Sequence, residues 1–335
     1  MNASTTRLRL LAVAAAAALA LPACSAMGVS GSSTSGTPNN VQFIVDTGPG
    51  GGSDLFARQL IKIARDQKVL TANWPVIAKP EGGGLGAMAY LKGKPADVNQ
   101  ISAFTSKWII AGLSTASAPA RLDDLTPIVA LADETQVIAA PADAPFNTMT
   151  EFLAAAKAKP GELVQSGGSP NSVDNLVALE IEKTSGTKWK YLSFDDGAPR
   201  ITAMLRGDAQ IDIGAINDFT DQIQAGKLKL ISVFSDKRLP DYPAVPTIAE
   251  QKIDLGEFPA HLQLRGIAGP PKLSDSAVKY YQDFFQKVSN TDAWKQYLAS
   301  VGLTPEFITG DDLNKQIAEF TGAVKPLVAG MVTNS

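Results

Sequence analysis

Short apolar runs alternate with segments of helical periodicity along most of this chain. Val41–Val45 has the pattern of a buried strand, and the following Phe56, Leu60, Ile63 and Ala64 fall on one face of a helix. This alternation predicts an α/β fold built from open, mostly parallel sheets flanked by helices. We expect further strands at Trp74–Ala78, near Ser102–Thr105, and at Val137–Pro141, Glu162–Gln165, Trp189–Phe194, Ile211–Ile216, Leu228–Phe234 and Arg265–Ala268.

Two of these runs have the character of connections between two parts of the fold. Val137–Pro141 is one, and Arg265–Ala268 is the other; helical patterns then fill the chain from Ser274 to Val332. The simplest organisation is a discontinuous lobe I (residues 41–140 and 259–335) with lobe II (residues 141–258) inserted. Two connections make a hinge, and a ligand cleft between the lobes follows.

The first 23 residues have the pattern of a signal peptide. Arg7 and Arg9 supply a positive start, and the apolar stretch Leu8–Leu21 is too short for a full membrane span. Leu21-Pro22-Ala23-Cys24 resembles the lipobox of bacterial lipoproteins, in which cleavage precedes a Cys that becomes lipidated. Cleavage after a nearby Ala, with Cys24 incidental, is the alternative.

Residues 24–40 are rich in Gly, Ser, Thr and Asn and have little to bury, as expected of a flexible tether. We therefore predict an exported protein in the periplasm or on the outer face of the membrane, held by lipid at Cys24. A surface receptor, a binding protein or a cell-envelope enzyme would each suit this location.

Composition excludes several classes of function. The 335 residues include 30 basic and 33 acidic side chains, and a pI of about 5.4 without a basic block argues against a nucleic-acid partner. A single Cys excludes an internal disulfide and a Cys-based zinc site. A single His leaves little material for a His-rich metal site or a Ser-His-Asp triad.

Gly-rich turns join several predicted strands to helices. In Thr47–Asp54, the glycines Gly50–Gly52 allow close approach of a bound group, and the start of the next helix favours an anion. No Lys follows these glycines, so the loop is not a nucleotide P-loop. Gly84-x-Gly86-x-x-Ala89 imitates a dinucleotide fingerprint but lacks the acidic residue after the next strand, so no cofactor is expected. Tight structural turns are the alternative.

Two further turns occur in the second half. Ser166–Ser172 offers hydroxyl and amide groups that suit a carboxylate, or that merely cap a helix. Asp195–Arg200 opens a short helix with Ile201, Met204 and Leu205 on one face. Pro199 suits the first helical position. Ala198 as the cap would leave the first amides for water or a ligand.

Taken in order, seven separated motifs resemble those of the extracytoplasmic solute receptors of tripartite tricarboxylate transporters, the TctC or Bug family. The resemblance spans most of residues 41–320. The motifs are Pro49–Asp54, Gly82–Gly86, Ser166–Gly168, Asp196–Pro199, Gly226–Leu228, Pro243–Thr247 with Glu250, and Gly302–Pro305.

This resemblance implies a two-lobed periplasmic-binding-protein fold (type II) that closes on a small carboxylate and delivers it to a membrane permease. The receptor would be a monomer without cofactor, metal or catalytic residues. Backbone amides, hydroxyls and ordered water would hold the ligand. The implied ligand-binding residues are Gly51, Gly52, Ser53, Asp54, Thr105, Ser106, Ser166, Gly167, Asp196, Gly197, Ala198, Pro199, Arg200, Asn217 and Asp218.

The chain departs from the family pattern at Asp195-Asp196, where a basic residue and Gly are common. Two acids there would repel a highly charged tricarboxylate such as citrate. The expected ligand is a small organic carboxylate, a di- or tricarboxylate or an aromatic acid, and the sequence does not decide between an aliphatic diacid, an aromatic acid and an amino acid. Arg200 either restores positive potential or is a solvated surface residue. Two other functions stay open: a ligand-sensing subunit of a membrane signalling protein, and a hydrolase that uses Asp195 and Asp196 as paired carboxylates.

Overall fold

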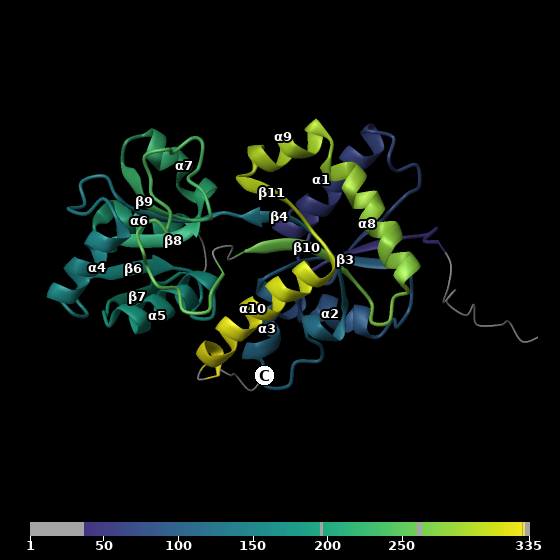
Figure 1. The fold of residues 1–335 in the computed structure, drawn as a ribbon, viewed down its shortest axis with the longest axis horizontal. Coiled ribbons are helices and arrows are strands. Elements are labelled where there is room, and N and C mark those ends of the chain that lie inside the picture. The colour runs from purple at the N-terminus through teal and green to yellow at the C-terminus, as the bar shows by residue number, and fades with distance from the viewer. Residues whose placement is uncertain (1–36, 195–196, 260–262, 330, 332–335) are drawn as a thin grey trace, which may run out of the picture. The chain divides into compact units, whose positions relative to one another are not determined.

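Two mixed β-sheets form the frame of the fold in the computed structural model, which describes residues 37–194, 197–259, 263–329 and 331 (Figure 1). The strands of the first sheet lie in the order β11-β4-β10-β3-β1-β2, and those of the second in the order β7-β6-β8-β5-β9. The strands are β1 (Gln42–Val45), β2 (Val76–Ala78), β3 (Gln100–Thr105), β4 (Thr126–Glu134), β5 (Gln136–Pro141), β6 (Val164–Gly167), β7 (Lys190–Ser193), β8 (Ile211–Ala215), β9 (Leu228–Phe234), β10 (Leu264–Gly269) and β11 (Leu303–Ile308).

Helices follow most strands directly, as the alternating pattern predicts. They are α1 (Gly52–Asp66), α2 (Leu85–Lys92), α3 (Lys107–Ser114), α4 (Met149–Ala158), α5 (Val173–Ser185), α6 (Gly197–Arg206), α7 (Ile216–Gln224), α8 (Asp275–Ser289), α9 (Asp292–Ser300) and α10 (Gly310–Val328), with short 3-10 helices η1 (Glu81–Gly84) and η2 (Leu122–Asp124). Among the described residues, no helix is long and apolar enough to cross a membrane.

The predicted α/β fold is confirmed, and the two sheets share one plan. The order β2-β1-β3-β10-β4 in the first sheet matches β7-β6-β8-β5-β9 in the second. In each, three strands run parallel, while the fourth, β10 or β5, runs antiparallel. Each sheet is therefore mixed, because the chain enters β5 from the first sheet and β10 from the second, and these two strands run against their neighbours.

The change of sheet falls between Glu134, the last residue of β4, and Gln136, the first of β5. A lobe boundary at residue 140 therefore lies at the far end of a strand that already pairs within the second sheet. The division into lobe I (41–140, 259–335) and lobe II (141–258) stays a prediction. The signal peptide, the tether and Cys24 lie outside the described residues.

The helical pattern predicted from Ser274 to Val332 is wrong at β11. Gly302 has a φ of +68°, which ends the preceding helix, and the chain then pairs antiparallel with β4. Pro305 fits there because β11 is an edge strand, and the side of the strand that is turned away from β4 needs no N–H group for a ladder hydrogen bond. Helix α6 also begins earlier than predicted, at Gly197, so Pro199 is its third residue and Ala198 is not its cap.

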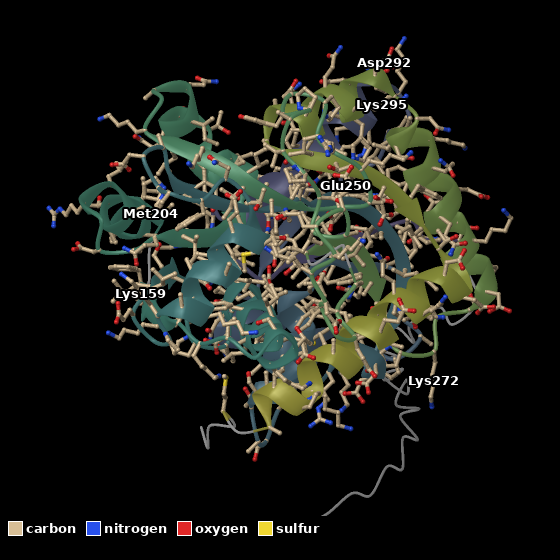
Figure 2. All side chains as sticks on the ribbon, turned by 60° about the vertical axis from the view of Figure 1, so that its left-hand side comes forward. Lys159, Met204, Glu250, Lys272, Asp292 and Lys295 are labelled. Carbon is tan, nitrogen blue, oxygen red and sulfur yellow. The ribbon has the colours of Figure 1, made fainter. Side chains whose placement is uncertain are left out.

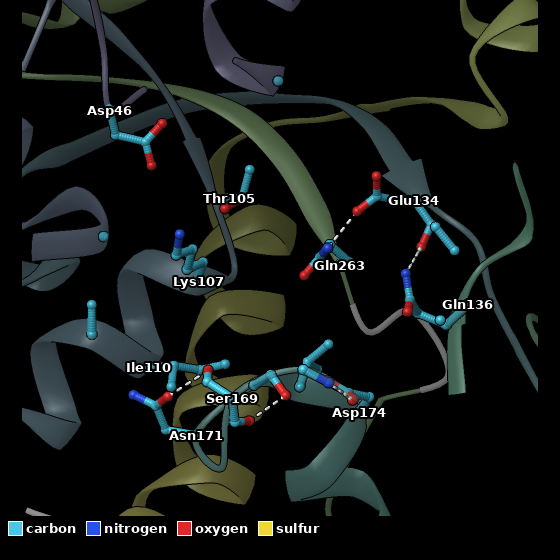
Figure 3. A pocket seen from close by; sticks show the side chains of 18 of the residues that line it. Asp46, Thr105, Lys107, Ile110, Glu134, Gln136, Ser169, Asn171, Asp174 and Gln263 are labelled. Carbon is cyan, nitrogen blue, oxygen red and sulfur yellow. Dashed lines mark hydrogen bonds between the residues drawn. The ribbon is translucent and has the colours of Figure 1, made fainter. Parts of the chain in front are cut away.

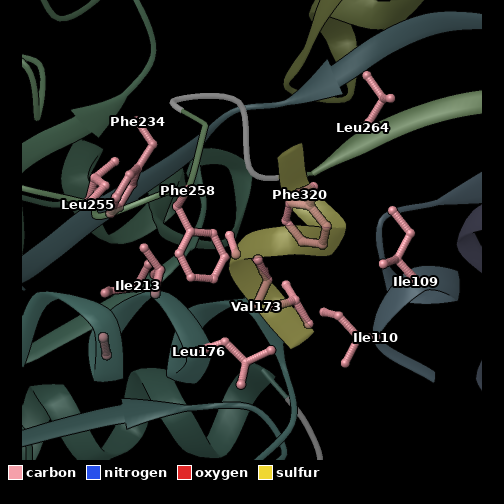
Figure 4. Close-up of a cluster of buried hydrophobic side chains, with 14 of the residues drawn as sticks. Ile109, Ile110, Val173, Leu176, Ile213, Phe234, Leu255, Phe258, Leu264 and Phe320 are labelled. Carbon is pink, nitrogen blue, oxygen red and sulfur yellow. The ribbon is translucent and has the colours of Figure 1, made fainter. Parts of the chain in front are cut away.

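One cluster of buried apolar side chains continues from the first sheet to the second along α10 (Figure 4). Phe320 of α10 packs edge-on against Phe258, with ring centroids 5.9 Å apart. Helix α10 contacts both α3 and α5. The C-terminal helix therefore carries apolar packing between the elements that follow β3 and those that follow β6.

The outer face of the first sheet has its own aromatic core. Trp294 of α9 is fully buried and meets Phe56 of α1 edge-on, at a centroid distance of 5.5 Å. On the same helix, Lys295 lies at the surface together with Asp292 (Figure 2). Aromatic burial on this face fixes α1, whose first turn lies at the pocket described below.

We expect Trp294→Ala to lower the free energy of unfolding by about 3–5 kcal/mol, because it leaves a cavity where a large ring packs. Urea denaturation followed by circular dichroism measures the change. Lys295→Ala on the same helix is the matched control and should stay within about 0.5 kcal/mol. Equal losses in both variants would show that the ring does not stabilise this core.

Candidate functional site

A cavity of about 590 Å³ lies where the loops of both sheets meet (Figure 3). Its lining comes from the segments that follow β1, β2, β3, β6 and β8, from Arg200 of α6, and from the two connections at Glu134–Gln136 and Gln263–Arg265. In open α/β sheets, ligands bind outside the carboxyl ends of parallel strands. This cavity occupies that place for both sheets at once.

The loop after β1 presents the start of α1 to the cavity. Asp54 accepts a hydrogen bond from the N–H of Gly50 (3.0 Å), and its own N–H donates to the Thr47 hydroxyl (3.2 Å). Gly52 and Ser53 line the cavity, and no described residue accepts a hydrogen bond from their N–H groups. These amides, at the positive end of the helix dipole, suit a carboxylate.

The loop after β6 repeats this construction at the start of α5. Asp174 accepts hydrogen bonds from the N–H of Gly168 (2.9 Å) and from the Tyr191 hydroxyl (2.7 Å). Burial, and then the charge of Asp174, raise the pKa of Tyr191, so its hydroxyl keeps its proton and remains a donor. Val173 and Asp174, in the first turn of α5, line the cavity. No described residue accepts a hydrogen bond from their N–H groups.

The two connections between the sheets meet at Glu134. Its carboxylate accepts hydrogen bonds from Gln263 and from Arg265 (Nη2–Oε1, 2.8 Å), while Gln136 donates to its backbone carbonyl. Arg265 also lies beside the start of α1, because a Cβ added to Gly52 would be 3.8 Å from its Nη1. A cationic guanidinium and two unpaired amides therefore face one part of the cavity.

Arg200 enters the cavity from α6 and pairs with Asp212 of β8. Asp212 is fully buried, accepts two hydrogen bonds from Arg200, and accepts a third from the Ser166 hydroxyl (2.6 Å). Burial raises the pKa of Asp212 to about 7, although the bonds from Arg200 and Ser166 oppose the rise. The carboxyl group of Asp212 therefore holds the Arg200 guanidinium in place, and it neutralises the Arg200 charge only as the pH rises above about 7.

Five predicted site residues line the cavity: Gly52, Ser53, Thr105, Arg200 and Asp218. Although Asp218 is exposed in the cavity, partial desolvation by the surrounding walls raises its pKa. The predicted ligand contacts of all fifteen residues stay a prediction. Nine lie near the loops but are not among the lining residues: Gly51, Asp54, Ser106, Ser166, Gly167, Gly197, Ala198, Pro199 and Asn217.

Several of these nine residues have a structural task. Asp54 holds its own loop and pairs with Arg58, whose hydrogen bond lowers the pKa of Asp54. Ser106 accepts the N–H of Leu264 (3.0 Å), and Ser166 supports Asp212. Asp195 and Asp196 lie outside the described residues.

Sequence reasoning missed most of the charged lining, namely Asp46, Lys107, Glu134, Asp174 and Arg265. Asp46 directly follows β1, and an acid at the carboxyl end of a strand was a usable signal. Arg265 interrupts an apolar strand, which was another. No local signal identifies Glu134, because its partner Arg265 is 131 residues away.

No group of His, Cys, Asp and Glu side chains within the described ranges is arranged to hold a metal ion. The lining instead offers amide N–H groups, hydroxyls, two guanidinium groups, one ammonium group and several carboxylates. This set can bind and orient a small polar organic molecule. The fold and the cavity together are those expected of a solute-binding protein.

The comparisons give the same class. The sequence model of the tripartite tricarboxylate transporter family receptor (TctC) matches residues 57–331. The chain is 25% identical to the protein BugT of Bordetella pertussis over 284 residues, 83% of this chain and 85% of BugT. It is 24% identical over 290 residues to a protein encoded in the gbd 5' region of Cupriavidus necator, with 86% of each chain covered.

Solved structures show the same fold. A TctC solute-binding protein from Polaromonas, without ligand, superposes with a TM-score of 0.76 at 24% identity, covering 87% of this chain and 98% of that one. Rpa4515 of R. palustris, solved with adipate, gives 0.67 at 18% identity (88% and 97%). MatC of Rhodopseudomonas palustris, solved with malate, gives 0.62 at 17% identity (86% and 98%). This chain belongs to the tripartite tricarboxylate transporter receptor family.

The loop after β6 gives a first prediction for the site. A Cβ at Gly167 would overlap the Tyr191 hydroxyl and the Asp174 carboxylate, so Gly167→Ala should disturb the hydrogen bonds that shape this loop. We expect a loss of about 1–3 kcal/mol in the free energy of unfolding, measured by urea denaturation. Gly197→Ala, where a Cβ meets no atom within 4 Å, is the control and should be near neutral.

Asp212 gives a second prediction, on pH. Because its pKa is raised in the folded protein, the folded state holds a proton between the unfolded pKa near 4 and about 7. Stability from this group is therefore greatest at low pH and is lost as pH rises toward 7, by up to about 1.4 kcal/mol per pH unit. Urea denaturation from pH 5 to 8 should show this slope in the parent chain and a shallower one in Asp212→Asn. Identical slopes would contradict the assignment.

Proposed function

We propose that this chain is an exported receptor that binds a small organic carboxylate in the cavity and delivers it to the membrane permease of a tripartite tricarboxylate-type transporter. One observation carries the proposal. Helices α1 and α5, which follow strands of different sheets, begin at the same cavity, and the first N–H groups of both helices have no acceptor among the described residues. Arg265 lies beside the start of α1. Export through residues 1–23, lipid attachment at Cys24 and closure of lobes I and II belong to the same proposal.

In this proposal, the carboxylate group of the ligand binds at the start of α1. The N–H groups of Gly52 and Ser53 donate to it, and Arg265 supplies a charge-assisted hydrogen bond. Hydrogen bonds to a charged group contribute about 1.5–3 kcal/mol each, so three or four of them support micromolar binding, about 8 kcal/mol, after the cost of association. Adipate and malate, bound by two family neighbours, support this chemical class.

The alternatives have less support. The hydrolase hypothesis needs Asp195 and Asp196, which lie outside the described residues, and the family consists of receptors. A sensing subunit would use the same cavity and differ only in its membrane partner. Co-purification with either a permease or a sensor protein separates these two roles.

The ligand class can be tested directly. A thermal-shift screen against mono- and dicarboxylates, including adipate and malate, should raise the melting temperature for at least one acid, because a ligand that binds only the folded state stabilises it. No shift with any carboxylate, together with a shift for uncharged sugars, would contradict the proposal.

Arg265 provides the mutational test. With an acid identified by the screen, Arg265→Gln should weaken binding by about 10- to 100-fold in calorimetry, because one charge-assisted hydrogen bond is lost. Arg206→Gln, at the end of α6 and away from the cavity, should bind like the parent. Because Arg265→Gln also removes the cationic partner of Glu134, the double variant with Glu134→Gln keeps the local charge balanced. Parent-like binding by both Arg265 variants would show that the carboxylate lies elsewhere.

A further inference from the structure

A second cavity, of about 480 Å³, lies between helix α1 and strand β2 at the edge of the first sheet, and we call it the β2 groove. Its lining includes buried Trp74 and half-buried Val76, which is the first residue of β2. Three cationic side chains of α1, those of Arg58, Lys62 and Arg65, line the same groove. The β2 groove therefore combines the edge of a strand with a row of positive charges.

The backbone of β2 has a free edge within the described part of the chain. The strand ends the first sheet and pairs with β1 on its inner side. The carbonyl of Pro75 and the N–H of Lys79 both bond to β1, so the odd-numbered residues of this segment face inward. Successive residues of a strand direct their N–H and C=O groups to opposite sides, so Val76 and Ala78 direct theirs outward. The N–H that Pro75 lacks belongs to the inner side and does not interrupt the free edge.

The surroundings of this edge are cationic, although the chain as a whole is slightly acidic. Residues 55–96 contain seven basic and two acidic side chains, against 30 and 33 in the whole chain. Helix α2 packs on the opposite face of the sheet from α1 (Figure 1). There, the ammonium groups of Lys79 and Lys94 lie over the ring of Tyr90, 4.9 and 5.6 Å from its centroid. Positive charges therefore flank the free edge on both faces of the sheet.

Two of the α1 cations are available to a partner. The side chain of Lys62 is 64% exposed, and its pair with Asp66 is an exposed i,i+4 pair, which contributes little to stability and opens easily. Arg65 is exposed and has no carboxylate partner among the described residues; it bonds to uncharged oxygens of the loop before β2. An acidic partner can therefore gain contacts here without breaking a buried ion pair.

We propose that the β2 groove docks an extended, acidic segment of a partner protein, which adds to β2 as a further strand. The outward N–H and C=O groups of Val76 and Ala78 form the ladder, and carboxylates of the segment contact the flanking cations. The same charges disfavour a second copy of this chain, because pairing two β2 edges brings like charges together. The inference goes beyond the proposed function, since the β2 groove shares no lining residue with the ligand cavity.

Synthetic peptides test the docking by fluorescence anisotropy on the full chain at low salt. The probe is a labelled heptapeptide of alternating Glu and Val. One control replaces every Glu by Lys, and the other is the Glu/Val peptide N-methylated at every residue, which keeps its charges but cannot pair as a strand. We expect the Glu/Val peptide to bind at least about tenfold more tightly than either control. Equal binding of either control, or no binding of the Glu/Val peptide, overturns the inference.

Variants of the chain locate the binding. Lys62→Glu should weaken binding of the Glu/Val peptide about fivefold, because it replaces attraction by repulsion. Lys279→Glu, which reverses the Lys of an exposed i,i+4 pair on α8, is the matched control and should bind like the parent. Ala78→Pro removes one outward N–H but no bond to β1, and it should weaken binding about five- to tenfold. Circular dichroism checks that each variant is folded.

Parent-like binding of the peptide by both Lys62→Glu and folded Ala78→Pro would show that the peptide binds elsewhere, and it would overturn the inference. If Ala78→Pro does not fold, the N-methylated peptide still decides whether a strand is added. Anionic lipid is the competing partner for a cationic surface. Vesicles of phosphatidylcholine and phosphatidylglycerol that bind the parent but not Lys62→Glu, together with no binding of the Glu/Val peptide, would assign the surface to lipid instead.

Discussion

The amide groups at the start of a helix have no partner inside the helix, and the whole site depends on this constraint. Helices α1 and α5 begin at one cavity, and in each case an Asp in the first turn accepts an N–H from a Gly of the preceding loop. Asp54 and Asp174 therefore use their charge to shape the loops. The next amides are left pointing at the cavity without committed partners.

The two guanidinium groups near these amides are each held by a carboxyl group. Arg200 contacts Asp212, and Arg265 contacts Glu134, so each guanidinium group has a fixed orientation at the cavity. Glu134 also joins the two connections between the sheets through Gln263 and Arg265. The residue that balances the charge of Arg265 is thus also part of the mechanical link between the two sheets.

The sequence predicted what depends on local pattern. Strands β1, β6, β8 and β9, and the Gly-rich loops that follow β1 and β6, were found because apolar runs and glycines fix them within a few residues. Gly52 and Ser53 lie at the cavity, and the sequence could place them there because a helix start follows directly from the chain. The hydrogen bond from the Gly50 N–H to the Asp54 carboxylate could not be predicted, because sequence does not show the direction of a side chain.

The rest could not be read because it is set by tertiary pairing. The segment of β11 was included in a helical pattern. It forms a strand because the edge of β4 is available for pairing, and the sequence of the segment does not show this. The pairing of Glu134 with Arg265 joins distant segments, and Asp212 is defined by its burial under Arg200. Local propensity contains no record of such neighbours.

Helix α10 has a consequence for how the ligand enters. Its apolar side packs against α3 and α5, which follow strands of different sheets, and Phe320 lies in the cluster that joins them (Figure 4). Any rotation of one sheet away from the other must slide these side chains past their neighbours or separate them and wet the exposed surface. Rotation of one sheet relative to the other is therefore opposed by the loss of apolar burial along α10, and this cost grows with the apolar area that the rotation exposes.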